Sequence, residues 1–491
     1  MNTQMKTFNS NICRILFATC FSALCLIALS THAATITVTN TNDTGAGSLR
    51  QALADARDGD TIHFGVTGTI TLMTDELLVD KSITIDGPGS ANLTIDGNQA
   101  IHDFHVSGGV TAIIAGLTIS HGGGVGFGGG GIYNDHSTLT IDRCTVSGNH
   151  GSAGGGVYND GSGTSATLTI TNSTFSSNWV AAPYSVGSGG AIYNDGGYGT
   201  ATVSVTNSTF SGNLAGIPGA YGWGGAIFND GYSGSATVRL NNSTFSGNDC
   251  FEGGAIYNRS AQVIIRHAIF NAATWSANIS SAYGSVSSLG YNVSSDDAGG
   301  FLRATGDQIN TNPMLGPLQN NGGPTFTHEL LAGSPAIDAG DPSFTPPPNY
   351  DQRGSGFQRV FNGRVDIGAF EVQPPAPSYA AQVQAPINPD GTSTFSVRRG
   401  VVPVKFNLTH GGVATCDLPP ATIAVTRTAG GVIGEINESI YSGNADSGSN
   451  FRIDSCQYIY NLNSRALGIG TYRVDILIDS QVVGHATFGL N

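Results

Sequence analysis

The stretch that decides the fold is Gly-Gly-Gly-Ile-Tyr-Asn-Asp at residues 129–135, because close variants of it recur along the middle of the chain. The variants end at Asp160, Asp195, Asp230 and Arg259. A second signature, which begins Asn-Ser-Thr-Phe-Ser and ends in Asn, recurs at 172–178, 207–213 and 242–248. A unit of this length cannot bury its apolar face alone, so its repetition predicts a solenoid of stacked units.

The spacing within the unit separates a rigid wall from variable corners. Leu139 and Val146 are seven residues apart, and the matching apolar pair keeps this offset in the four later copies. Insertions fall at two corners instead. Ten residues separate Asn178 and Asn213 from the next Gly-Gly, against four after the first and last copies. The longest corner loops therefore belong to adjacent units in the middle of the stack.

Side chains within the wall alternate with a period of two. Leu139 and Ile141 would face inward and Thr140 outward, as in a half-buried strand. The shortest copies hold about 25 residues, which matches one turn of three short strands. We therefore predict an all-β chain whose main body is a right-handed parallel β-helix with stacked phenylalanines in its core. These are Phe175, Phe210, Phe245 and Phe270.

Residues 1–33 have the pattern of a secretory signal peptide. Lys6 and Arg14 precede an apolar run at 15–29, and Ala33 closes the segment. Its removal would leave 18 basic and 34 acidic side chains, a formal charge of −16. We expect a secreted, extracellular or bacterial cell-surface protein without a transmembrane segment in its mature form. So acidic a chain also disfavours nucleic acid as a partner.

The rest of the chain divides by composition. Residues 34–115 are predicted to form an N-terminal cap and the first solenoid turns, with Ser48 capping a helix over 49–57. The regular repeats cover 116–275, and a turn-rich continuation covers 276–372. A proline-rich linker at 373–378 then leads to short strands over 379–491, which predict an immunoglobulin-like β-sandwich.

Four cysteines remain after the signal segment. Cys416 and Cys456 lie in the C-terminal domain and could form a disulfide in an oxidising compartment. Cys144 occupies a strand position that holds serine in later copies, and Cys250 lies at a corner several turns away. We expect the second pair to stay unbonded.

Several motifs carry family resemblances. The Gly-Gly-Ala-Ile and Phe-x-x-Asn pairs over 116–275 resemble the repeats of polymorphic outer-membrane proteins. Gly-Ser-Leu-Arg-Gln-Ala at 47–52 resembles the start of CSLREA-type domains, although Gly47 replaces the cysteine and Gln51 the glutamate. The motifs at 334–340, 351–354 and 366–371 are similar to the end of choice-of-anchor Q proteins, and Val-Pro-Val-Lys-Phe at 402–406 resembles PxKF domains. Together these resemblances imply a surface or secreted β-helix of the pectin-lyase-like fold, without one defined activity.

Polysaccharide cleavage is the enzymatic alternative, since this fold hosts lyases and hydrolases. Such enzymes need a basic residue with clustered acids that hold Ca²⁺, or paired carboxylates at a productive separation. Residues 116–258 hold seven acids and two arginines, so a polyanion would be repelled. The one Asp-Asp pair, Asp296 and Asp297, lies outside the repeats. The sequence assigns no catalytic residue.

Polar columns of two kinds follow from the repeat, asparagines at two repeat positions and acids at one. Stacked asparagines at each repeat position would bond to one another and to corner backbone groups. The acids Asp135, Asp160, Asp195 and Asp230 would form a further column. We expect solvated corner side chains there, because loop lengths vary beside them; a row of weak Ca²⁺ sites is the sharper hypothesis. His102 and His105 would face opposite sides of a strand, so metal binding by that pair is not expected.

Aromatic residues in the enlarged corners are the binding candidates. They are Trp179, Tyr184, Tyr198, Tyr221, Trp223 and Tyr232. Such rings could stack on sugars or anchor a protein, or could pack their own loops down. We favour a non-catalytic adhesin or glycan-binding module whose partner is a glycan or a cell-surface protein. The alternatives are a polysaccharide lyase or hydrolase and a structural envelope protein.

Overall fold

The computed structural model describes residues 33–123, 128–180, 187–216, 221–271, 273, 276–373, 379–416, 419–431, 433–436, 446, 448–478 and 481–491. The chain divides into two compact units, Met1–Gln373 and Pro374–Asn491. Most of the predicted signal segment, the linker residues 374–378 and Tyr184 lie outside the described residues.

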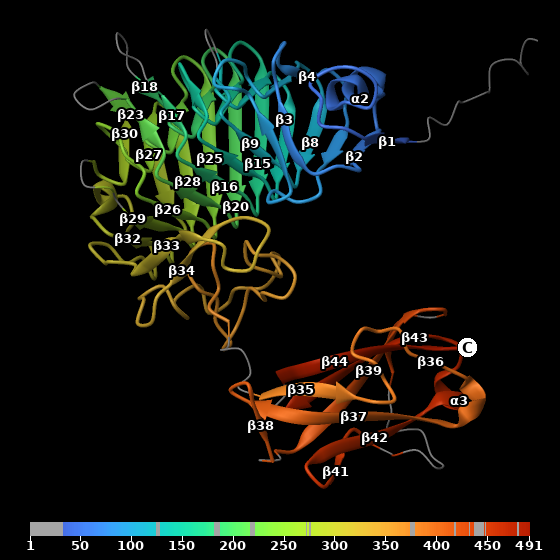
Figure 1. Ribbon diagram of the computed structural model, residues 1–491. Coiled ribbons are helices and arrows are strands. Elements are labelled where there is room, and N and C mark those ends of the chain that lie inside the picture. Colours follow the sequence, from blue (N-terminus) through green and yellow to red (C-terminus); the bar gives the residue numbers. More distant parts are fainter. Residues whose placement is uncertain are drawn as a thin grey trace, which may run out of the picture. The chain divides into compact units, whose positions relative to one another are not determined.

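Three long parallel sheets form the wall of the first unit (Figure 1), and consecutive strands of the coil fall in different sheets. The ten-stranded sheet runs β1 (Thr35–Val38), β2 (Thr61–Phe64), β5 (Thr84–Asp86), β8 (Thr111–Ala115), β11 (Thr138–Asp142), β15 (Ser165–Thr171), β20 (Thr200–Thr206), β25 (Ser235–Asn241), β28 (Gln262–Arg266) and β31 (Ser285–Ser288). The nine-stranded sheet runs β3 (Gly68–Thr71), β6 (Leu93–Asp96), β9 (Thr118–Ser120), β12 (Thr145–Ser147), β16 (Thr174–Ser176), β21 (Thr209–Ser211), β26 (Thr244–Ser246), β29 (Ile269–Asn271) and β32 (Val293–Ser294). The eight-stranded sheet runs β4 (Leu77–Val79), β7 (Phe104–Val106), β10 (Ile132–Asp135), β14 (Val157–Asp160), β19 (Ile192–Asp195), β24 (Ile227–Asp230), β27 (Ile256–Arg259) and β30 (Ile279–Ala282). The predicted right-handed parallel β-helix is confirmed.

The core of this β-helix consists of columns of like residues. Phe175 stacks on Phe210 with ring centroids 4.9 Å apart, and Phe210 stacks on Phe245 at 4.7 Å. Phe270 continues the stack at 5.4 Å. All four side chains are fully buried. The register follows from the constant seven-residue spacing within each copy. One extra residue there would turn the side chains to the other face of the sheet.

Two ladders of buried amides run beside the aromatic column. In the first, the side-chain amide of Asn134 donates to Asn159 at 2.6 Å, and this step repeats towards the C-terminus. Its later members are Asn194, Asn229 and Asn258. In the second, Asn149 donates to Asn178, which donates to Asn213, which donates to Asn248. Each amide thus satisfies its neighbour where the chain turns a corner.

A short helix covers the N-terminal end of the stack. The helix α2 (Leu49–Asp55) begins after Ser48, whose hydroxyl accepts from the backbone N–H of Gln51 at 3.2 Å. Leu49, Ala52 and Leu53 join the β-helix core. The helix ends at Asp55 rather than at Arg57 as predicted, because Ala56 is already extended. The core residues and strand edges at the N-terminal end of the stack are thereby covered.

The enlarged corners carry small sheets of their own. One joins β13 (His150–Gly151), β17 (Trp179–Val180) and β22 (Leu214–Ala215), and another pairs β18 (Gly187–Ser188) with β23 (Gly222–Trp223). Both lie between the nine-stranded and eight-stranded sheets along the chain. The predicted loop insertions therefore continue the parallel stacking for a few residues.

The turn-rich segment 276–372 first completes the last coil with β30, β31 and β32, and its later part packs on the outer face of the nine-stranded sheet. It contains η1 (Ala298–Gly300) and the antiparallel pair β33 (Leu315–Gln319) and β34 (Thr327–Leu330). The Thr209 hydroxyl bonds to the Gln352 side chain at 2.6 Å, and Thr174 donates to the Phe326 carbonyl at 2.6 Å. A column of outward threonines is thus buried by a part of the chain more than one hundred residues away.

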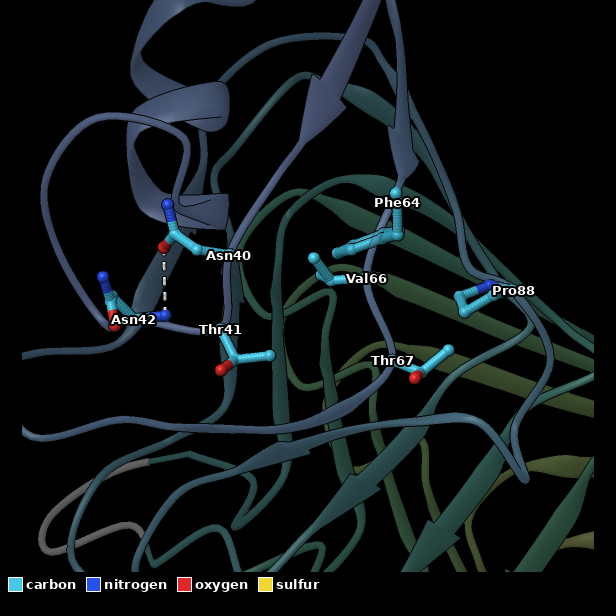
Figure 2. Close-up of a pocket in the computed structure, with 8 residues that line it drawn as sticks. Asn40, Thr41, Asn42, Phe64, Val66, Thr67 and Pro88 are labelled. Atoms are coloured by element: carbon cyan, nitrogen blue, oxygen red, sulfur yellow. Dashed lines mark hydrogen bonds between the residues drawn. The ribbon is translucent and has the colours of Figure 1, made fainter.

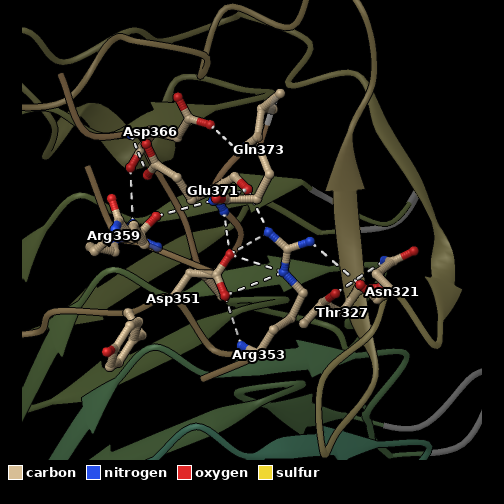
Figure 3. A network of polar contacts seen from close by, with 12 residues as sticks. Asn321, Thr327, Asp351, Arg353, Arg359, Asp366, Glu371 and Gln373 are labelled. Carbon is tan, nitrogen blue, oxygen red and sulfur yellow. Dashed lines mark hydrogen bonds and ion pairs between the residues drawn. The ribbon is translucent and has the colours of Figure 1, made fainter. Parts of the chain in front are cut away.

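Buried charges hold this covering segment together (Figure 3). Arg353 Nη2 lies 2.6 Å from Asp351 Oδ2, and the same carboxylate accepts the Glu371 backbone N–H at 2.8 Å. Arg359, which is fully buried, donates to the carbonyl of Asp366. The two motifs at 351–354 and 366–371 therefore meet in one network. Asp351 and Arg353 are paired and hydrogen-bonded, as buried charges require, whereas Arg359 Nη1 has no hydrogen-bond partner among the described residues.

The second unit is an immunoglobulin-like β-sandwich of two mainly antiparallel sheets. One contains β35 (Tyr379–Gln384), β37 (Val401–His410), β38 (Val413–Thr415), β41 (Arg452–Asp454) and β42 (Gln457–Asn463). The other contains β36 (Thr394–Phe395), β39 (Ala421–Ala429), β40 (Gly434–Ile436), β43 (Gly470–Ile478) and β44 (Gln481–Leu490). Two short helices, η2 (Val397–Arg399) and α3 (Ser464–Leu467), complete the described elements. Phe406 and Tyr458 stack in its core at 4.4 Å.

The cysteines fall as the sequence suggests. Cys416 and Cys456 are joined by a disulfide in the second unit. Cys144 and Cys250 are buried and free in the first. Burial raises the pKa of both free thiols to about 12, so neither is a reactive thiolate at neutral pH.

Candidate functional site

The outer face of the eight-stranded sheet carries the most organised polar surface of the described chain. In β10, Ile132 and Asn134 face the core, so Tyr133 and Asp135 face outward. Parallel pairing in register repeats this arrangement on β14 and β19. The face therefore has a column of aromatic residues beside a column of carboxylates.

The structure contains the predicted column of carboxylates, and an arginine follows its last member. Asp135, Asp160, Asp195 and Asp230 are successive register partners, and Asp230 is paired with Arg259 on β27. Arg259 Nε donates to Asp230 Oδ1 at 2.9 Å. The expectation of solvated corner acids is wrong for Asp160 and Asp230, which are 7% and 3% exposed. Bonds to neighbouring coils draw these carboxylates inward.

Tyrosines of one coil bind the aspartates of the next. Tyr133 donates to Asp160 Oδ2 at 2.8 Å, and Tyr193 donates to Asp230 Oδ2 at 3.0 Å. Burial and the neighbouring Asp160 raise the pKa of Tyr133 well above its ordinary value. The hydroxyls therefore remain donors throughout the physiological range. A carboxylate that is satisfied in this way has less need of a metal ion, and the row of Ca²⁺ sites stays a prediction.

At the N-terminal end of the columns His105 replaces tyrosine, and a second histidine, His136, follows Asp135. His105 occupies the register position of Tyr133, with its Nδ1 2.6 Å from Glu76 Oε1. The bond to Glu76 raises the pKa of His105. His136 bonds to Asp135, and its Nε2 lies 2.8 Å from the Ser162 carbonyl. Burial opposes protonation of His136, yet these bonds raise its pKa.

The aromatic binding candidates divide between two corners. Trp179, Tyr221 and Trp223 lie at the corner that precedes the eight-stranded sheet, whereas Tyr198 and Tyr232 follow it. Trp223 stacks on Tyr257 with ring centroids 5.5 Å apart. Of the two roles considered from the sequence, binding a partner or packing within the protein, this contact is the second. Trp179 stacks on His150 at 5.0 Å and keeps 37% of its surface exposed. The described candidates therefore lie at opposite ends of the strands of this sheet.

Three of these candidates are well exposed. Tyr198 is 78% exposed, Tyr221 63% and Tyr232 59%. The Arg259 guanidinium lies 5.6 Å from the Tyr232 ring centre, which holds that ring at the end of the carboxylate column. These rings are thus available to a partner, and their positions are set by neighbouring coils.

Phe251 belongs with these residues although its sequence context did not single it out. It packs edge-to-face on Tyr221 with ring centroids 4.8 Å apart and is 55% exposed. It lies in one of the short corners, whereas the binding candidates were chosen from the enlarged ones. The sequence signal was a phenylalanine in a corner loop too short to bury its ring.

The hollow between the first turns offers no catalytic groups (Figure 2). Its lining is made of Asn40, Thr41, Asn42, Phe64, Gly65, Val66, Thr67 and Pro88. The Asn42 backbone N–H donates to Asn40 Oδ1 at 3.1 Å. No titratable side chain lines this hollow among the described residues.

The Asp-Asp pair noted in the sequence stabilises a turn. Asp296 accepts from the backbone N–H of Asn278 at 2.7 Å, and these bonds lower its pKa despite burial. Asp297 caps the 3₁₀ turn η1 through the Gly299 N–H. Both carboxylates thus serve the backbone and are not presented as an acid–base pair.

One family comparison matches the chain. Residues 207–230, which run from the corner before β21 to the end of β24, match the Chlamydia polymorphic membrane protein repeat. No curated protein matches the chain. Within the described residues, no helix is long and apolar enough to cross a bilayer. The resemblances at 47–52, 312–371 and 402–406 remain predictions.

Proposed function

We propose that this chain is a non-catalytic protein of the bacterial surface or outer membrane that binds glycans through aromatic side chains at the corners of its β-helix. The match to a membrane-protein repeat supports the surface assignment. The observation that carries the binding proposal is the exposed pair of Tyr221 and Phe251 on adjacent coils. Rings held by neighbouring strands lose little conformational freedom when they bind a ligand.

The chemistry of this pair fits sugars. Each ring is more than half exposed, and their edge-to-face contact fixes two planes at an interplanar angle of 75°. One plane can stack on the C–H face of a sugar while the other contacts its edge. The chain carries a formal charge of −14, so neutral or amino sugars are expected rather than polyanions.

The proposal is tested on a glycan array that contains neutral, amino and acidic sugars. The double variant Tyr221→Ala/Phe251→Ala should lose binding by roughly tenfold or more, since truncation of paired aromatic anchors has effects of this size. Tyr283→Asn is the matched control, because Tyr283 is 98% exposed and has a positive φ of 60° that asparagine tolerates.

Three outcomes would overturn the proposal. Binding that survives the double variant excludes the Tyr221 and Phe251 pair as the site. An array without hits, together with no binding to cells, favours a structural envelope protein. Release of reducing or unsaturated ends from a polysaccharide panel would instead identify a lyase or hydrolase.

A further inference from the structure

The first step of the column of carboxylates differs from all later steps. In later coils a tyrosine hydroxyl donates to the aspartate of the next coil. At the first step the donor position belongs to His105, whose Nε2 lies 3.4 Å from Asp135 Oδ2. The other oxygen of Asp135 faces Nδ1 of His136. One carboxylate therefore lies between two imidazoles.

Both nitrogens of each imidazole face an oxygen acceptor. His105 faces Glu76 Oε1 at 2.6 Å with Nδ1 and Asp135 with Nε2. His136 faces the Ser162 carbonyl at 2.8 Å with Nε2 and Asp135 with Nδ1. A neutral imidazole has one N–H, so the lone pair of His136 faces Asp135 when its Nε2 donates to the Ser162 carbonyl. A bound cation would replace this contact by bonds to both side chains.

The surrounding groups resemble the support that metal ligands receive. A metal-bound histidine usually donates its other N–H to a carboxylate or a backbone carbonyl. The Ser162 carbonyl serves His136 in this way, and Glu76 orients His105 beside Asp135. Asp160 is fixed by the Tyr133 hydroxyl and by Ser162. The ligand candidates are thus oriented before any ion arrives.

The candidate ligand atoms are close together and reachable from solvent. Asp135, His136 and Asp160 each offer one ligand atom, and these atoms lie within 4.8 Å of one another. The side chains of His136 and Asp135 are 31% and 28% exposed. At the other end of the column Arg259 neutralises Asp230. At this end, among the described residues, Asp135 pairs with His105 and His136.

We propose that Asp135, His136 and Asp160 bind a divalent transition metal of the Zn²⁺ class, and that His105 holds Asp135 in position for it. Mixed imidazole and carboxylate ligands suit Zn²⁺, whereas Ca²⁺ takes oxygen ligands. This site is confined to the first two coils of the column and differs from the calcium row considered from the sequence. It is independent of the glycan-binding proposal.

The repeat itself supplies the test variants. Ser260 holds the same position after its strand as His136 does, with the same positive φ of 51°. His136→Ser should therefore keep the corner intact. His105→Tyr restores the residue found at 133, 158 and 193 in later coils. His136→Ser removes the nitrogen ligand, and His105→Tyr replaces the imidazole that supports Asp135. Both introduce a side chain that the repeat already accommodates.

Calorimetric titration of the full chain with ZnCl₂ and with CaCl₂ measures the binding. We expect one equivalent of Zn²⁺ to bind, His136→Ser and His105→Tyr each to weaken binding roughly 10–100-fold, and Zn²⁺ to raise the melting temperature of the wild type more than that of either variant. His121→Asn is the control, since His121 pairs with Asp96 on another sheet and has a positive φ of 53°. It should bind Zn²⁺ as the wild type does.

The absorption spectrum of the Co²⁺ form gives a second readout that does not depend on the folding of the variants. Visible bands of a four-coordinate site with nitrogen and oxygen ligands support the proposal. The proposal is overturned if the wild type binds no Zn²⁺, if Ca²⁺ binds in preference, or if His136→Ser and His105→Tyr bind Zn²⁺ as tightly as the wild type.

Discussion

The hydroxyl of Tyr158 donates a 2.6 Å hydrogen bond to Oδ2 of Asp195 on the following coil. Burial and Asp195 raise the pKa of Tyr158, so this donor stays protonated. A hydrogen bond to a charged acceptor contributes about 1.5–3 kcal/mol. Tyr158→Phe should therefore lower the free energy of unfolding by about 2 kcal/mol, measured by urea denaturation. Tyr198→Phe, at an exposed corner, should change it by less than about 0.5 kcal/mol.

Asn213 should be more sensitive than any surface asparagine. Its amide donates to Asn248 Oδ1 at 2.8 Å, and its Oδ1 accepts from the Asn178 side chain at 2.9 Å. Asn213→Ala leaves buried groups on both neighbouring coils unsatisfied, and each costs about 1–3 kcal/mol. The urea midpoint should fall clearly, while the exposed Asn349→Ala leaves it unchanged. Equal midpoints for the two variants would contradict the structural role of the ladder.

His267 should make the first unit sensitive to acid. Its side chain is fully buried, and burial together with Arg266 and Arg359 lowers its pKa from 6.5 to about 3. The unfolded state therefore takes up a proton below pH 6.5 while the folded state does not. Its stabilising contribution is full above pH 6.5 and decreases as the pH falls towards 3. The loss is at most about 3 kcal/mol at pH 4.

The repeat offers a variant that isolates this effect. Asn172, Asn207 and Asn242 occupy the equivalent corner position with φ near that of His267. His267→Asn should thus retain the turn and flatten the dependence of the urea midpoint on pH between 7 and 4. Carboxylates titrate in both proteins, so the difference between the two curves reports on His267. Parallel curves would show that this histidine does not control the acid response.

The disulfide should matter to the second unit alone. Cys416 and Cys456 are 40 residues apart in the sequence, and closing a loop of this length stabilises a fold by about 3–4 kcal/mol in the chain-entropy treatment. Replacing both cysteines by serine should lower the melting transition of the β-sandwich. The β-helix transition in the same calorimetric scan serves as the internal control and should not move.

The repeats made the wall of the β-helix predictable. Equal spacing from Leu139 to Val146 and from Val203 to Phe210 determines which residues face the core, and the stacked phenylalanines follow from it. Parallel neighbours of identical type also make the amide ladders foreseeable. These contacts all join residues one coil apart, so the local pattern contains them.

Contacts between parts of the chain that do not repeat could not be predicted from the spacing of the repeats. The bond between Thr209 and Gln352 spans 143 residues, and no periodicity links the two positions. The tyrosine–aspartate bonds run diagonally between columns, which the register alone does not specify. The six aromatic candidates were grouped because they lie in long loops. Loops before and after one strand, such as those of Trp223 and Tyr232, lie at opposite ends of that strand.

Because all bonds of an asparagine ladder run in the same direction, the number of coils in the β-helix can change during evolution without breaking the ladder. Every coil brings one amide donor and one amide acceptor, and Asn159 accepts from the coil before it and donates to the coil after it. A duplicated or deleted whole coil would restore the same bond across the new junction. Gene duplication in units of one turn can therefore lengthen or shorten the stack while the helix at its N-terminal end remains as it is.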